Sequence, residues 1–126
     1  MPRLRFRGYH ALMRVKRILM ANELASYRES IALAIRELRP DVEVIKADSG
    51  SVNQEVLRLS PDLVICSRVT SVVRDHAPNW VELYPDCEAL STVYINGEIS
   101  TMDDVQLSDL LSLVDRLEPW LGASSG

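Results

Sequence analysis

Polar side chains that could take part in chemistry follow two apolar segments of this sequence. Asn22 and Glu23 come directly after the apolar run 18–21, and Ser67 comes directly after 63–66. If both runs are parallel strands, these side chains meet at the carboxyl edge of the sheet, where doubly wound folds bind ligands. A carboxylate beside a serine would place a base next to a nucleophile. No histidine lies near them in the sequence and no oxyanion donor can be named, so we expect no catalytic residue and no enzyme.

Three further polar residues belong to the loops at the same predicted edge, and with the first three they outline a candidate ligand crevice: Ser49, Arg68 and Thr70. Ser49-Gly50-Ser51 precedes a helical pattern, and the free N–H groups at the start of a helix can bind an anion. The segment lacks a glycine-rich phosphate loop. We therefore interpret these serines as ordinary helix-capping residues.

The histidines and cysteines form neither a metal site nor a disulfide framework. His10 and His76 have no partner at the spacing of metal ligands, so we expect no metal and no cofactor. Cys66 lies in an apolar run, Cys87 lies in a polar segment, and there is no CxxC pair. We predict that Cys66 is a small buried hydrophobic residue, because free cysteine is among the most buried residue types.

Strand and helix patterns alternate through the first 76 residues. Continuous apolar runs predict three strands, the most apolar of them covered on both faces: 15–21, 42–47 and 62–67. Apolar residues at intervals of three and four predict three helices: 24–38, 52–59 and one that begins at 69. Pro40, Pro61 and Pro78 end these helices. A β-α-β-α-β-α order implies a parallel sheet.

The last third of the chain departs from that order. Asn96-Gly97 lies between the strand patterns 91–95 and 98–102, and this dipeptide suits the positive φ angles of a type I′ turn. The pattern predicts an antiparallel hairpin of the fourth and fifth strands at one edge of a mostly parallel sheet. A terminal helix is predicted over 107–117, capped near Asp103 or Asp104 and ended by Pro119.

Residues 77–90 have the least regular pattern in the chain. Trp80, Val81, Leu83 and Tyr84 fit one side of a single helical turn. We predict that this turn covers the sheet, with an exposed aromatic binding patch as the alternative.

The composition is typical of one globular domain of an ordinary soluble protein. Hydrophobic residues make up 47% and charged residues 25% of the 126 residues. No apolar run approaches the roughly 18 residues of a membrane span, and arginines interrupt the first 17 residues too often for a secretory signal. We therefore expect a cytoplasmic protein that does not insert into a membrane.

Charge is distributed unevenly along the chain. Residues 1–17 contain six basic residues and no acid, which leaves 8 basic against 18 acidic residues in the rest. An acidic body argues against nucleic-acid binding, except through the leader residues Arg3, Arg5 and Arg7. We divide the chain into a basic leader (1–13), an α/β domain (14–121) and a flexible tail (122–126). Whether the leader is ordered stays open, as does an over-extended gene start before Met13.

Three passages resemble the receiver domains of two-component response regulators: 17–23 (RILMANE) with the helix start after it, 60–67 (SPDLVICS), and the terminal helical pattern 107–117. The similarity is good over roughly residues 15 to 75 and poor beyond them. It implies a flavodoxin-like three-layer sandwich of about five strands and a role in signal transduction. Many doubly wound domains share these apolar strand patterns, so the motifs are moderately specific.

The resemblance also implies a phosphorylation site, and this sequence departs from it. Receivers use an aspartate after the third strand as the phosphoryl acceptor, an acidic pair for Mg²⁺, and a lysine after the fifth strand. Here the acidic pair falls on Asn22 and Glu23, and the acceptor position falls on Ser67, which cannot form an acyl phosphate. Lys16 and Lys46 are the only lysines, so the family's lysine has no counterpart. These three positions would be vestigial.

The sequence therefore favours a pseudo-receiver that acts by protein–protein interaction, with a protein partner or a second copy of itself in a homodimer. The terminal helix and the neighbouring hairpin edge are the expected contact faces, because an unpaired edge strand accepts another strand. The alternative function is a small-ligand or anion binder, or a weak enzyme, that uses the crevice. A further alternative is an accessory of transcription or RNA that makes contact through its basic leader.

Overall fold

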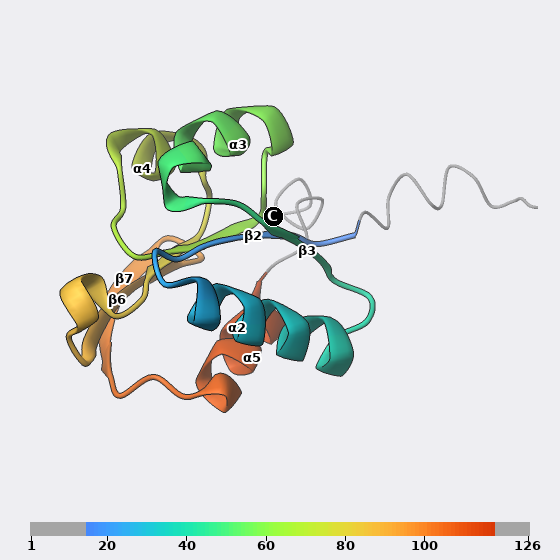
Figure 1. Cartoon of the computed structure of the whole chain (residues 1–126), viewed down its shortest axis with the longest axis vertical. Coiled ribbons are helices and arrows are strands. Elements are labelled where there is room, and N and C mark those ends of the chain that lie inside the picture. Colours follow the sequence, from blue (N-terminus) through green and yellow to red (C-terminus); the bar gives the residue numbers. More distant parts are fainter. Residues whose placement is uncertain (1–14, 118–126) are drawn as a thin grey trace, which may run out of the picture.

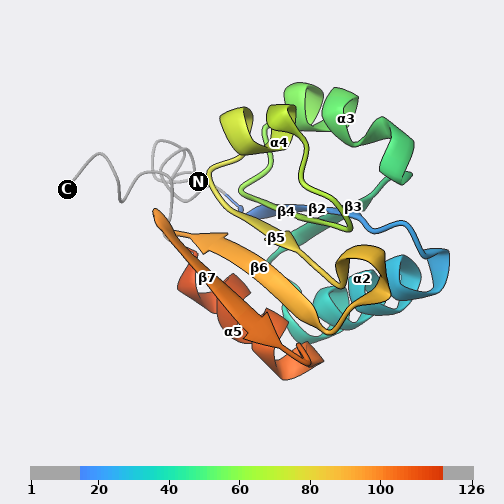
Figure 2. The ribbon, with the colours of Figure 1, turned by 90° about the vertical axis from the view of Figure 1, so that its left-hand side faces the viewer.

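The computed structural model describes residues 15–117, which form a mixed sheet with helices on both faces (Figures 1 and 2). The predicted leader (1–13), residues 118–121 with Pro119, and the predicted tail (122–126) lie outside the described residues. The strands are β2 (Arg17–Ala21), β3 (Glu43–Lys46), β4 (Leu63–Cys66), β5 (Trp80–Glu82), β6 (Leu90–Ile95) and β7 (Glu98–Asp103). The helices are α2 (Ala25–Leu38), α3 (Val52–Leu59), α4 (Ser71–His76) and α5 (Leu107–Arg116), with short 3₁₀ turns η1 (Ser49–Ser51) and η2 (Pro85–Cys87).

The six strands lie in the order β3-β2-β4-β5-β6-β7. The first four in this order are parallel, and β6 and β7 continue the sheet in antiparallel fashion. The three apolar runs of the first half form β2, β3 and β4 as predicted. The register pairs Ile18 with Leu63 and Ala21 with Cys66, so β2 and β4 end at the same edge.

Alternate residues of the central strands pack into two cores, one on each face of the sheet. Ile18 and Met20 face α2 and α5, whereas Leu19 and Ala21 face α3 and α4. Figure 2 shows α3 and α4 on one side of the sheet and α2 and α5 on the other. Because β2 and β4 are buried on both sides, their sequences are continuously apolar rather than alternating.

The predicted helical turn around Trp80 is wrong, because this segment forms the additional strand β5. β5 pairs in parallel with β4, where Val64 lies opposite Trp80, and antiparallel with β6. Trp80 and Val81 are buried on opposite faces of the sheet. That alternation has the period of a strand. A run this short does not distinguish a buried strand from a buried helical turn by its pattern. The sheet therefore has six strands instead of five.

The predicted hairpin is present. Asn96 and Gly97 have φ angles of 53° and 86°, and Ile95 pairs with Glu98 across the turn. The prediction that Asp103 or Asp104 caps the terminal helix is wrong. Gln106 is the N-cap residue of α5, and its backbone N–H donates to Asp109 Oδ2 at 2.8 Å. Asp103 belongs to β7 instead.

No helix within residues 15–117 has the length and apolar character needed to cross a bilayer. The compartment in which the protein works stays a prediction.

Candidate functional site

The carboxyl edge of the parallel strands brings together the side chains that the sequence analysis singled out. Asn22 follows β2 and Ser67 follows β4, and the pairing of Ala21 with Cys66 places the two polar residues side by side. Asn22 Nδ2 donates to Ser67 Oγ at 3.2 Å, and the backbone N–H of Glu23 donates to the same oxygen at 2.7 Å. A neutral hydroxyl therefore joins the ends of two neighbouring strands.

Asn22 is the most deeply buried polar residue of this edge. Only 1% of its surface is exposed, and its Nδ2 group also donates to the carbonyl of Leu83, just after β5, at 3.2 Å. Arg28 Nη1 donates to the backbone carbonyl of Asn22 at 2.9 Å. Among the described residues, Asn22 Oδ1 is buried without a hydrogen-bond partner. The amide therefore links the ends of β2, β4 and β5 without a formal charge.

The hydrogen bonds within residues 15–117 do not join the Glu23 carboxylate to the Ser67 hydroxyl as a base beside a nucleophile. Glu23 contacts Ser67 through its backbone N–H, which is a donor and cannot remove a proton from the hydroxyl. Ser67 Oγ accepts both of its hydrogen bonds, so its environment holds the oxygen in place rather than activating it as a nucleophile.

A small cavity of about 220 Å³ lies at this edge. Five of the six predicted residues line it, together with Gly50 and three apolar neighbours: Glu23, Ser49, Ser67, Arg68, Thr70, Ala21, Val52 and Cys66. Asn22 is not part of the lining. The sequence therefore predicted the membership of this crevice well, because parallel strands deliver their following loops to one edge.

Several crevice residues also have structural partners. Thr70 Oγ1 caps α4 by accepting the N–H of Val73 at 3.1 Å, and it lies 2.6 Å from Asn53 Oδ1, to which it donates. Arg68 forms an exposed ion pair with Asp86 at 2.6 Å. Ser51 occupies the N-cap position of α3, as predicted, but its side chain makes no capping hydrogen bond.

Cys66 is buried in the wall between the crevice and the core, as predicted, and Cys87 is exposed. Burial, reinforced by the nearby carboxylate of Glu82, raises the pKa of the Cys66 thiol from 9.0 to about 12. A thiol in this state is almost entirely protonated at neutral pH, so it is a poor nucleophile.

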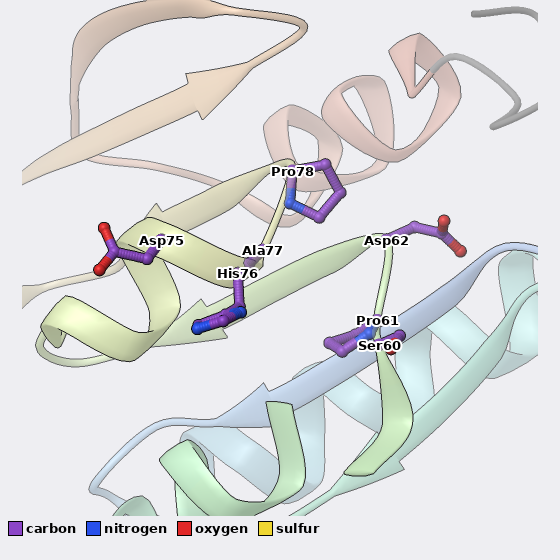
Figure 3. Close-up of a pocket in the computed structure, with 7 residues that line it drawn as sticks. All are labelled: Ser60, Pro61, Asp62, Asp75, His76, Ala77 and Pro78. Carbon is purple, nitrogen blue, oxygen red and sulfur yellow. The ribbon is translucent and has the colours of Figure 1, made fainter. Parts of the chain in front are cut away.

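A larger cavity of about 340 Å³ lies at the opposite, amino edge of β4, and the sequence analysis did not identify it. Its lining combines acidic, imidazole and proline side chains: Ser60, Pro61, Asp62, Asp75, His76, Ala77 and Pro78. In Figure 3 the carboxylate of Asp62 and the imidazole of His76 point away from each other. Asp62 Oδ2 instead accepts the backbone N–H of Arg17 at 2.7 Å. These groups do not form an acid–base cluster.

Within residues 15–117, no group of three or more His, Cys, Asp or Glu side chains is placed to hold a metal ion. Comparison with known proteins finds no matching family model, no matching curated protein and no matching solved structure.

Proposed function

We propose that this protein is a receiver-like signalling module that has lost phosphoryl-acceptor chemistry and acts through protein contacts. One observation carries the proposal: Ser67 occupies the end of β4, where a receiver would have its acceptor carboxylate, and its Oγ is held by Asn22 Nδ2 and the Glu23 N–H. A serine hydroxyl forms a phosphate ester rather than the acyl phosphate of that family. The residue at the acceptor position therefore serves to join two strands.

The charges around this position also support the proposal. Phosphoryl transfer needs oxygen ligands for Mg²⁺ and a cation to offset the charge that develops on the phosphoryl group. Asn22 replaces one member of the acidic pair with a neutral amide, and the sequence has no lysine after Lys46. Arg68 lies at the crevice but pairs with Asp86, and guanidinium is not equivalent to a compact ammonium.

The strand order supports a flavodoxin-like arrangement for the first four strands. β2 lies between β3 and β4, so the chain reverses its direction across the sheet after β3, as in doubly wound folds of that type. The hairpin β6-β7 then takes the place of the helix and fifth strand that would complete a receiver. It leaves β7 at the edge of the sheet, where its only partner strand among the described residues is β6.

We propose the β7 edge as the contact surface of the module. An edge strand presents backbone donors and acceptors that a partner strand can use. Its ends carry Glu98 and Asp103, and antiparallel pairing of two β7 strands brings these acids close together. A basic partner strand is therefore favoured over a second copy at this edge, and a homodimer would need another face, such as α5.

The cavity at the carboxyl edge makes a small-ligand binder the second candidate function. Five of the six predicted polar residues surround this cavity of about 220 Å³. It lies below the range of roughly 300–1,000 Å³ that is typical of ligand pockets. A ligand of this site would therefore be a small polar molecule. An NMR titration that shifted the amide signals of Ser49, Ser67 and Thr70 in a saturable manner would favour this function.

Intact-mass measurement tests the main proposal. The full-length protein is incubated with Mg²⁺ and acetyl phosphate beside a receiver domain that is known to accept phosphoryl groups. We expect the control to gain one labile phosphoryl group and this protein to keep its mass. A hydroxylamine-sensitive mass gain in this protein would show that an acyl phosphate had formed and would overturn the proposal.

A further inference from the structure

Within residues 15–117, no strand pairs with the outer edge of β7. The N–H of Asp104 donates to the carbonyl of Ala89 at 3.2 Å. Hydrogen-bonded and non-hydrogen-bonded residue pairs therefore alternate along the two strands, starting from the pair Ile95 and Glu98 at the turn. In an antiparallel ladder this alternation turns every second residue of β7 toward β6 and the others away from it. The N–H groups of Ile99 and Thr101 therefore point out of the sheet, where a further strand would accept them.

An apolar row ends at the same edge. Trp80, Tyr94 and Ile99 lie opposite one another on three neighbouring strands, and the rings of Trp80 and Tyr94 stack with centroids 5.6 Å apart. Ile99 is 66% exposed. Figure 2 shows α3 and α4 over the other half of the sheet, and no helix of the described residues lies on that side of β6 and β7. A strand added to β7 would extend this row if it placed an apolar side chain beside Ile99.

The charge of this region defines the strand that fits it. Residues 77–115 contain eight acidic residues and no Lys, Arg or His. Two of the eight, Glu98 and Asp103, lie at the two ends of β7. A complementary strand must therefore be basic and must also carry apolar residues on one face.

Residues 3–7 of the same chain have this composition. The segment Arg3-Leu4-Arg5-Phe6-Arg7 alternates strictly between basic and apolar residues, and residues 1–17 contain no acid. An alternation with period two is the pattern of a strand with one apolar face. Leu4 and Phe6 would share one face of it and the three arginines the other.

We propose that residues 3–7 add to β7 as an antiparallel strand, with Phe6 beside Ile99 and Arg7 beside Glu98. The topology sets the direction of the added strand. β7 runs parallel to β2, so both strands begin at the same edge of the sheet. The chain must reach that edge to enter β2, so the leader strand must end there and run antiparallel to β7. A shift of one residue would put arginine beside Ile99, so the apolar row excludes odd shifts. Of the two apolar residues in the segment, Phe6 is placed beside Ile99 because its ring continues the aromatic pair Trp80 and Tyr94.

The intervening chain is long enough for this arrangement. β2 and the new strand are five strand spacings apart, which is about 24 Å at about 4.8 Å each. The eight Cα steps from Arg7 to Val15 span up to about 28 Å when extended. The leader would then occupy the edge that we propose for a partner, and partner and leader would compete for it. The inference does not depend on receiver chemistry, since strand addition needs only the free edge and complementary charge.

Amide hydrogen exchange, measured by NMR on the full-length chain, tests this inference. We expect the amides of Ile99 and Thr101 to exchange at least about tenfold more slowly in the unaltered protein than in the triple variant Arg3→Glu, Arg5→Glu, Arg7→Glu. The amide of Ile65 in the core serves as an internal control of folding and should not change. Equal exchange at Ile99 and Thr101 in the two proteins would overturn the proposal.

Exchanging the charges of Glu98 and Arg7 gives a second test. In the variant Glu98→Lys, the amide of Ile99 should lose its protection from exchange. The double variant Glu98→Lys, Arg7→Glu restores opposite charges at the two positions and should regain most of that protection. Arg14→Glu changes the leader charge outside the alternating segment, so this matched control should keep the protection. Protection that rises with protein concentration would mean that a second copy supplies the strand and would contradict docking within one chain. Failure of the charge exchange to restore protection would contradict the register.

Discussion

Asn79→Ala is expected to weaken the attachment of the hairpin β6-β7 to the parallel half of the sheet. Asn79 is 7% exposed and lies just before β5. Its Nδ2 donates to the carbonyl of Asp62 at 2.8 Å, and its Oδ1 accepts the backbone N–H of Asn96 in the hairpin turn at 2.8 Å. One side chain thus connects the loop before β4 to the β6-β7 turn.

The size of the effect follows from these two bonds. A typical intramolecular hydrogen bond contributes about 1 kcal/mol, and a partner left unpaired in a partly buried position costs more. We expect Asn79→Ala to lower the free energy of unfolding by about 1–3 kcal/mol, measured by urea denaturation with an unchanged m-value. Gln54→Ala removes an exposed amide from α3 and should change stability by less than about 0.5 kcal/mol. Equal stability of the two variants would refute the role assigned to Asn79.

Further predictions concern side-chain reactivity, pH and capping. The raised pKa of Cys66 lowers its thiolate fraction at neutral pH about a thousandfold. Iodoacetamide should therefore modify the native protein once, at the exposed Cys87. Modification of both cysteines without denaturant would contradict this. Burial raises the pKa of the Tyr84 phenol, whose hydroxyl donates to the carbonyl of Val105. The folded state therefore holds this proton more tightly than the unfolded state, and stability should fall as pH rises above the ordinary phenol pKa, less steeply in Tyr84→Phe. Asp109→Ala removes the acceptor of the Gln106 N–H at the start of α5 and should cost about 1 kcal/mol in thermal or urea unfolding, whereas no loss would contradict this capping role.

Several strands of the fold follow from patterns that have one physical meaning. A strand buried on both faces must be continuously apolar, which identified β2 and β4. Asn96-Gly97 has the backbone freedom that a two-residue hairpin turn needs, which identified β6-β7. β5 was missed because three residues give too short a run to distinguish strand from helix. Its pairing with β4 depends on Asn79, whose contacts join segments far apart in the sequence.

The membership of the candidate site was predictable, but its hydrogen bonds were not. Parallel strands deliver their following loops to one edge, so Glu23, Ser67 and Thr70 were expected to meet there, and they line one cavity. The sequence could not show that Glu23 contacts Ser67 through its backbone, or that Thr70 caps α4. Which hydrogen-bond partner a group takes depends on distances of a few tenths of an ångström.

An NMR titration of the full-length protein with Mg²⁺ tests the central claim most directly, because a site with an amide at Asn22 and a hydroxyl at Ser67 has too few carboxylate ligands to hold that cation. The account predicts that the amide signals of Glu23, Ser67 and Leu83 keep their positions up to millimolar Mg²⁺. Saturable shifts centred on these three residues would show that the edge still binds the metal of phosphoryl transfer, and would contradict the account.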